Sequence, residues 1–387
     1  MPPPRPRRRH RLAALLCAAA GATGCGERAD SFQPNGLLRA TGGLTDEQSS
    51  SIDAALAELF GSPDEPRLPP ELPRMAELCD LAALQQAAGP VASHEVGVTQ
   101  GLYRRHCARC HGVTGDGRGP TARYQSPYPR DFRRGVFKWK STYRDAPPTV
   151  ADLDRVLEHG VPGTAMPSFR LLSEEEREIL QQYVIYLAIR GQTERALVSL
   201  VADELPAGEP LRLEGDLRDE VMSESLAPIV AAWVDAESDV VSPPDSSEVD
   251  DRLIARGRDL YHSEKAGCFK CHGAAGQGGA VAGKDYEIDY DRWTRERVVA
   301  RPSDAVAHLV RQDLPIRPSR PRQLIGATPH GGDATADLYR RVHQGIAGTT
   351  MPAVGGAYPG QPGSLTDEEV QSVVVYLQSI NPKESPL

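Results

Sequence analysis

The sequence is poor in aromatic residues, which make up 5% of its 387 positions. Aromatic side chains supply much of the buried apolar area of ordinary cores. A chain long enough for two domains but with so few aromatic residues is short of core material for each of them. An excess of basic residues is also missing, since the formal net charge is −9. This charge argues against nucleic acid as a partner.

The beginning of the chain lacks an apolar stretch that could span a bilayer. Residues 1–25 carry five arginines in the first eleven positions, and the apolar run that follows covers only residues 12–20. This order is typical of a secretory signal peptide and too short for a transmembrane helix. Residues 22–24 before Cys25 resemble a lipoprotein box, so acylation of Cys25 and simple cleavage both stay open. We expect a periplasmic or otherwise exported protein, with lipid anchoring to a bacterial membrane as the second form.

The pattern C-x-x-C-H occurs twice in the chain. Its two copies are formed by Cys107, Cys110 and His111, and by Cys268, Cys271 and His272. Two thiols at this spacing can form thioethers with the vinyl groups of a porphyrin, and the adjacent imidazole can ligate the iron. Each copy therefore predicts a site of covalent haem attachment.

A Met-Pro loop follows each copy. Residues 151–167 and 336–352 are identical at nine of seventeen aligned positions, and they end in Met166-Pro167 and Met351-Pro352. A single methionine would be interpreted as core filler. Two methionines in the same repeated context are instead predicted to be axial iron ligands, and a His/Met pair gives a relatively high potential.

Zinc and phosphate do not fit these motifs. Paired cysteines that bind zinc usually lie about 15–20 residues apart, whereas 157 residues separate Cys110 from Cys268. Zinc would also leave the two histidines and the two Met-Pro loops unexplained. The glycines at 112–119 are not followed by G-K-[ST], so a phosphate-binding loop is excluded.

Residues 96–192 and 251–383 each resemble the class I cytochrome c family, in a tandem dihaem form. The resemblance implies an all-α fold with two small haem domains and two covalently bound haem c groups. It also implies that Met166 completes the iron site of His111, and Met351 that of His272. Each haem would supply the large apolar body that the scarcity of aromatic residues leaves missing.

The remaining segments complete the predicted organisation. A leader at 1–25 precedes a short helical N-terminal region at 26–95, and an acidic linker at 193–250 joins the haem domains. Helices are expected at 45–60, 74–88 and 98–109, from the capping box at Ser173 to about Arg190, and after a second capping box at Thr366. Cys79 lies on an apolar helical face and is predicted to be a buried, inert thiol.

Two stretches are strongly charged. Residues 96–150 contain eleven basic and three acidic residues, whereas the linker contains fifteen acidic and three basic residues. The basic stretch, especially 128–140, could neutralise haem propionates, dock an acidic partner or an anionic membrane, or be a solvated face. The linker is expected to be partly helical and partly flexible, and it could cover the basic face, bind a cationic partner or only aid solubility.

The second domain carries an insertion. His272 and Met351 are 79 positions apart, against 55 for His111 and Met166. The insertion, at about 280–330, contains His308 and His330, which we expect to be exposed or satisfied in the core. The alternative is that one of them replaces Met351, which would lower the potential.

The resemblance implies single-electron transfer between redox proteins, with a membrane respiratory complex as one candidate partner. A six-coordinate His/Met iron has no open position for a substrate. The alternative is a dihaem enzyme, such as a peroxidase or a sulfur-compound dehydrogenase, in which one distal ligand is exchangeable.

Overall fold

The computed structural model describes residues 31–89, 101–244, 250–279, 314–315, 321–326, 329–356 and 358–381. Regular structure in these residues is helical, and they contain two isolated β-bridges but no strand. The prediction of an all-α fold is therefore confirmed. The predicted leader, including Cys25, lies outside the described residues.

The N-terminal region is helical, with one difference from the sequence prediction. Its elements are α1 (Gly36–Thr41), α2 (Asp46–Phe60), η1 (Pro73–Glu77) and α3 (Leu81–Ala87). The helix predicted at 45–60 is confirmed by α2. The helix predicted at 74–88 is divided, because the Asp80 side chain caps a new helix by accepting from the Ala83 amide at 3.0 Å.

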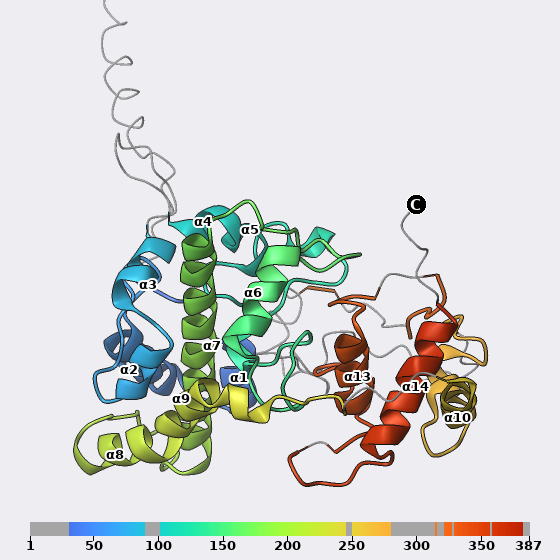
Figure 1. The fold of residues 1–387 in the computed structure, drawn as a ribbon. Helices are drawn as coiled ribbons and strands as arrows, with labels where there is room; N and C mark the ends of the chain where they lie inside the picture. Colours follow the sequence, from blue (N-terminus) through green and yellow to red (C-terminus); the bar gives the residue numbers. More distant parts are fainter. Residues whose placement is uncertain are drawn as a thin grey trace, which may run out of the picture.

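The first haem domain packs around one long helix. Its elements are α4 (Leu102–His106), α5 (Ala108–His111), η2 (Ala122–Tyr124), η3 (Phe132–Arg134), α6 (Val150–His159) and α7 (Glu174–Asp203). The capping box predicted at Ser173 is present, since Glu176 donates its amide to the Ser173 hydroxyl and accepts from the Ser173 amide. In Figure 1, α7 runs through the middle of this part of the molecule, with α2 and α3 on one side and α6 on the other.

Helix α7 is longer than the sequence predicts. We expected it to end near Arg190, but it continues to Asp203. The extension buries Leu197, Val198 and Val201 in a core shared with the N-terminal region. The N-terminal region is therefore built onto the first haem domain.

Most of the described part of the predicted acidic linker is helical. After the end of α7 it forms α8 (Gly215–Glu220), the π-helical η4 (Val221–Leu226), α9 (Ala227–Val234) and η5 (Ala236–Asp239). Arg218 pairs with Glu58 and Glu71, and Asp235 pairs with Arg74. These ion pairs join the linker to the N-terminal region. None of the helices in the described part of the chain is both long and apolar enough to cross a membrane.

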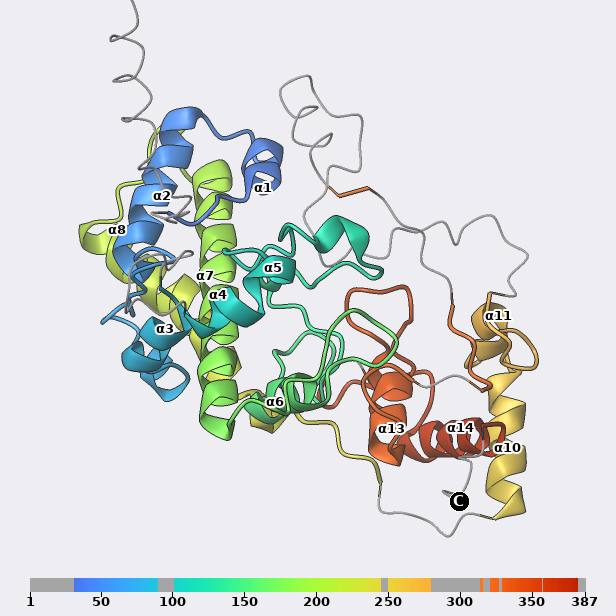
Figure 2. The ribbon, with the colours of Figure 1, turned by 90° about the horizontal axis from the view of Figure 1, so that it is seen from above.

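The second haem domain contains α10 (Asp251–Tyr261), α11 (Cys268–His272), α13 (Thr335–Gln344) and α14 (Asp367–Ser379). Helices α10 and α14 cross closely (Figure 2). At the crossing, a Cβ atom on Gly257 would lie 1.9 Å from the carbonyl oxygen of Ser372, so only glycine fits. Thr366 and Glu369 form the second predicted capping box. His308 and most of the insertion lie outside the described residues.

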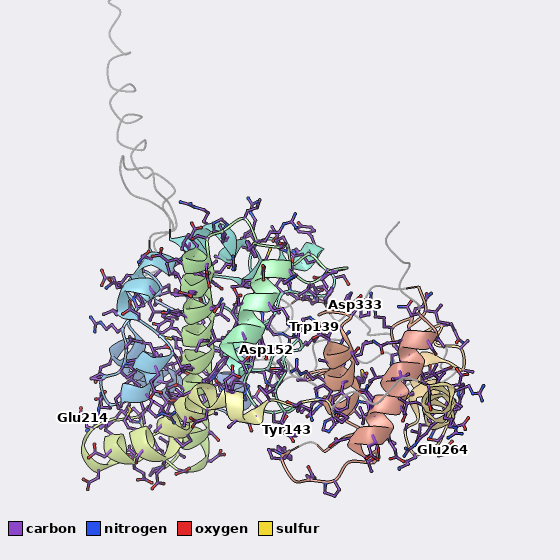
Figure 3. All side chains as sticks on the ribbon, viewed as in Figure 1. Trp139, Tyr143, Asp152, Glu214, Glu264 and Asp333 are labelled. Atoms are coloured by element: carbon purple, nitrogen blue, oxygen red, sulfur yellow. The ribbon has the colours of Figure 1, made fainter. Side chains whose placement is uncertain are left out.

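The two haem domains are in contact. Tyr143 of the first domain packs against the core of the second, which also includes Val241 of the connecting segment. Arg155 of α6 forms an ion pair with Asp337 of α13, and Tyr358 donates its hydroxyl to Asp145 at 2.6 Å. Figure 3 shows Trp139 and Tyr143 at the side of the first domain that faces the second. The elements around the two motifs therefore form one packed unit.

Candidate functional site

A cleft in the first haem domain brings together residues that are far apart in the sequence. Cys107, Cys110 and His111 line it, and Met166 lines it as well. Its empty volume, including space open to solvent, is about 1110 Å³. Its apolar lining includes Phe132, Phe137, Leu157, Val161, Phe169 and Val184. An open, mostly apolar cleft with two thiols, an imidazole and a thioether fits a covalently attached haem.

His111 is oriented by its backbone neighbour and by an aromatic ring. Its Nδ1 lies 3.0 Å from the carbonyl oxygen of Arg130 and donates to it, which leaves Nε2 for iron. The imidazole stacks on Phe132 with 4.6 Å between ring centroids. Burial lowers the pKa of His111 to about 4. The imidazole is therefore held neutral, which is the form that ligates a metal.

The two thiols of the first motif differ in their surroundings. Cys107 is buried, and burial raises the pKa of its thiol to about 12. Cys110 is more exposed, and its Sγ accepts from the Gln125 amide at 2.9 Å. One thiol thus lies in the apolar part of the cleft and the other at its polar margin.

The backbone of Met166 is held by three linked hydrogen bonds inside its loop. Val161 donates its amide to the Met166 carbonyl at 3.1 Å, the Thr164 hydroxyl donates to the Val161 carbonyl, and the Met166 amide donates to the Thr164 hydroxyl. Because both the donor and the acceptor of Met166 are bonded within the loop, the backbone of this methionine is fixed.

The second Met-Pro loop has the same three bonds. Ile346 donates to the Met351 carbonyl at 3.3 Å, and Thr349 links the Ile346 carbonyl to the Met351 amide. The repeated threonine of G-T-x-M-P was visible in the sequence, but its role as the internal link of the loop was not predicted.

The second attachment motif is built like the first. Cys268, Cys271 and His272 lie on the single turn of α11, and Nδ1 of His272 donates to the carbonyl oxygen of Arg322 at 2.8 Å. Burial lowers the pKa of His272 and raises that of Cys268 to about 11. The histidine of each C-x-x-C-H motif is therefore neutral and held by the carbonyl of an arginine that follows a proline.

Two tyrosines support the motifs, and the sequence analysis missed them. Tyr103 donates its hydroxyl to the carbonyl oxygen of Gly112 at 2.9 Å, and Tyr261 donates to that of Gly273 at 2.7 Å. Both glycines directly follow the C-x-x-C-H histidine, and both tyrosines are almost fully buried. A tyrosine shortly before each first cysteine was the available signal.

The cations of the basic stretch are used mainly inside the molecule. Arg133 pairs with Asp131 in the core, and the Lys140 ammonium donates to the carbonyls of Tyr143 and Ala146. Burial lowers the pKa of Lys140 to about 7. Arg130 and Lys138 line the haem cleft. The strongly exposed cations of residues 101–150 are Arg105, Arg109 and Arg123. The basic stretch is therefore mostly not a solvated face.

His330 lies between the two haem domains. Its ring packs edge to face on Trp139, which lines the first cleft, at 5.9 Å between centroids. Its Nε2 accepts from the Arg322 guanidinium at 2.5 Å. Burial and the nearby charges of Arg322, Arg341 and Lys138 lower its pKa to about 4. His330, which could have replaced Met351 as an iron ligand, therefore has its Nε2 occupied by a hydrogen bond from Arg322.

Cys79 has the predicted surroundings. It is 1% exposed, its thiol donates to the Gln182 carbonyl at 3.4 Å, and burial raises its pKa to about 12. Such a thiol is poorly reactive.

Two family models match the chain. The model described as cytochrome C oxidase, cbb3-type, subunit III matches residues 96–184, and the cytochrome c model matches residues 254–381. No curated protein matches the chain significantly. A chain of the reducing HAO-like protein complex of Kuenenia stuttgartiensis is similar at 24% identity and a TM-score of 0.47, over 72% of this chain and 94% of that chain. Each family match contains one C-x-x-C-H motif and one Met-Pro loop.

Proposed function

Since this chain is a c-type cytochrome with two haem domains in tandem, we propose that it carries single electrons between redox proteins of a respiratory chain at a bacterial membrane. Two covalently bound haem c groups supply the one-electron iron couple of such a protein. The observation that carries the proposal is that His111 and Met166, from different segments, line one cleft.

The cleft residues favour a carrier over an enzyme. A neutral His111 and the fixed backbone of Met166 suit two permanent axial ligands. Catalysis at a metal ordinarily needs an open coordination position. If His111 and Met166 hold the iron from both sides, exchange of electrons with another protein would be the chemistry left to it.

Charged residues of the first domain suit both haem binding and docking. Arg130 and Lys138 line the cleft and would neutralise the carboxylates of the haem. The exposed Arg105, Arg109 and Arg123 would attract an acidic redox partner and raise the rate of encounter. Export by the leader at 1–25, with or without acylation of Cys25, would place the protein at the outer face of a bacterial membrane.

The first test is spectroscopic. Haem that stays on the chain in denaturing electrophoresis would show thioether attachment. The oxidised protein should show the sulfur-to-iron charge-transfer band of methionine ligation and no high-spin fraction at rest. A high-spin fraction would overturn the carrier assignment in favour of an enzyme with an exchangeable distal ligand.

The second test is a set of methionine variants. Met166→Ala and Met351→Ala should each lower the potential of one haem only, because a thioether favours reduced iron. Met222→Ala is the control, since Met222 is also buried but lies in η4 of the linker. If neither ligand variant shifts a potential, the axial assignment is wrong.

A further inference from the structure

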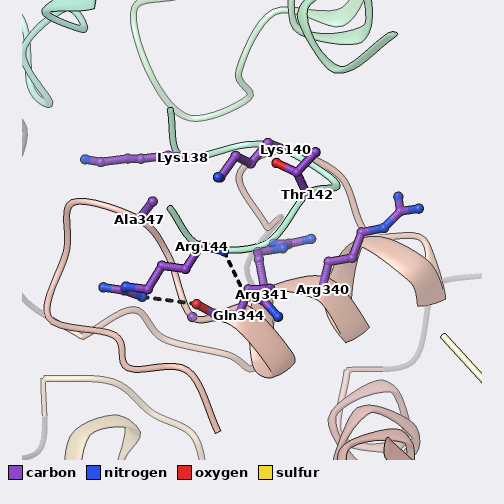
Figure 4. Close-up of a pocket in the computed structure, with 9 residues that line it drawn as sticks. Lys138, Lys140, Thr142, Arg144, Arg340, Arg341, Gln344 and Ala347 are labelled. Atoms are coloured by element: carbon purple, nitrogen blue, oxygen red, sulfur yellow. Dashed lines mark hydrogen bonds between the residues drawn. The ribbon is translucent and has the colours of Figure 1, made fainter. Parts of the chain in front are cut away.

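Arg144 of the first haem domain reaches into the second. Its amide donates to the Gln344 side-chain oxygen at 2.9 Å. Its guanidinium donates through Nη1 to the carbonyl oxygens of Gln344 and Met351, both at 3.1 Å, and through Nη2 to that of Thr349 at 3.3 Å. Figure 4 shows Arg144 beside Gln344, in a small pocket that cationic side chains from both domains line.

These three carbonyls belong to the loop that presents Met351. Gln344 ends α13, and its carbonyl is one of those that a helix leaves without an internal partner. A cation is favoured at a helix C-terminus, and hydrogen bonds from a charged donor are stronger than neutral ones. The Arg144 guanidinium therefore links the end of α13 at Gln344 to Thr349 and Met351 of the loop that follows.

The local backbone leaves room for this contact. Gly345 has φ +65°, and a Cβ atom on it would lie 2.6 Å from Nη1 of Arg144 and 2.4 Å from the Met351 carbonyl oxygen. Any other residue at this position would meet both the guanidinium and the loop. The glycine after α13 thus allows an arginine of the neighbouring domain to approach the backbone.

We infer that Arg144 is a positioning residue for the second haem, so that the methionine of one domain is held in place by the other domain. The inference rests on the proposed function, in which Met351 is an axial ligand. Groups that orient a metal ligand and the charge near it both tune the potential. Removal of Arg144 loosens the Met351 loop and removes a positive charge beside it, and both effects lower the potential of the second haem.

The experiment is a redox titration of the full-length protein with both haems attached. Arg144→Ala should lower the potential of one haem and weaken up to half of the methionine charge-transfer band, with the other haem unchanged. Arg144→Lys keeps the charge but lacks the planar fork that places Nη1 and Nη2 on separate carbonyls, so we expect a smaller shift in the same direction. The control is Arg155→Gln, which removes the ion pair with Asp337 at the same interface but does not contact the loop. It should leave both potentials unchanged.

A double-mutant cycle with Met351→Ala identifies the haem and the route. If Arg144 acts through the methionine, adding Arg144→Ala to Met351→Ala should lower the potential by less than it does in the wild type. Equal shifts in both backgrounds, equal shifts from Arg144→Ala and Arg155→Gln, or no shift from Arg144→Ala would overturn the inference. If the wild-type protein itself lacks the methionine band, the proposed function fails instead.

Discussion

The two haem domains share one order of motifs but differ in what surrounds it. The core of the first domain continues without a break into the N-terminal region and the linker, from Phe32 to Trp233. In the described part of the second domain, a smaller cluster centres on Tyr339 of α13 and the valines of α14. The first motif is therefore supported by an extended apolar core. The second depends more on its haem and on contacts with the first domain.

The largest expected effect comes from removing the haem attachment of each domain in turn. Cys268→Ser with Cys271→Ser should unfold the second domain, because the small core of its described part loses its largest apolar body. Cys107→Ser with Cys110→Ser should leave α2, α3 and α7 folded, since these helices bury apolar side chains against one another. Limited proteolysis with mass spectrometry would locate the unfolded part. If the two domains resisted the protease equally in these variants, they would not differ in how far their folding depends on haem.

A second prediction concerns the buried ion pairs between the N-terminal region and the extension of α7. Glu194 is 1% exposed and accepts from Arg39 at 2.8 Å, with the Arg190 guanidinium 3.6 Å away. Glu194→Gln should lower the free energy of unfolding of this part by about 3–5 kcal/mol, because the buried Arg190 guanidinium loses its charged partner and Arg39 keeps only Asp53. Denaturant unfolding followed by circular dichroism measures the loss.

The control for this variant is Asp235→Asn, which breaks the exposed pair with Arg74 and should change the stability little. The potential of the second haem should be unchanged in both variants. A similar loss of stability in both would show that burial of Glu194 does not matter.

The sequence predicted the features that repeat and missed those that depend on long-range contacts. Both capping boxes and the Met-Pro loops are local patterns, and the structure has the capped helices at Ser173 and Thr366 where they were expected. The extension of α7 was missed because its buried face includes Glu194, a residue type that is seldom buried.

The basic stretch shows the same limit. Lys140 and Arg144 were counted only as two of the eleven cations of this stretch, yet one is bonded to carbonyls of its own domain and the other to carbonyls of the next. Their partners lie in segments that no spacing rule connects to them. Composition gave the net charge of the stretch but not which cations are exposed.

A third prediction compares the two supporting tyrosines. Tyr103→Phe and Tyr261→Phe each remove the tyrosine hydroxyl that donates to the carbonyl of the glycine directly after a C-x-x-C-H motif. Each should cost about 1–3 kcal/mol, because the glycine carbonyl then keeps one donor only, the amide of Gly115 at 3.3 Å or that of Gly276 at 3.1 Å. Because the described part of the second domain has the smaller core, its unfolding midpoint should shift more, as measured by denaturant unfolding followed at each haem. Shifts of equal size would indicate that the two domains are equally stable.

The smallest effect is expected at Cys79, in the core next to the first domain. Its pKa is raised by burial to about 12, whereas a thiol in the unfolded chain ionises near pH 8.5. Between these values the unfolded chain has lost the proton and the native protein keeps it, so the contribution of Cys79 to stability falls as the pH rises. The free energy of unfolding relative to Cys79→Ala should drop by about 1–2 kcal/mol from pH 7 to pH 10.

The matching chemical measurement is alkylation at pH 9, followed by mass spectrometry of the peptide that contains Cys79. The native thiol should stay unmodified while the unfolded one reacts, because the thiolate is the nucleophile. Rapid alkylation of the native protein would mean that the interface between α3 and α7 opens readily. The first haem domain would then lack the rigid apolar support that distinguishes it from the second.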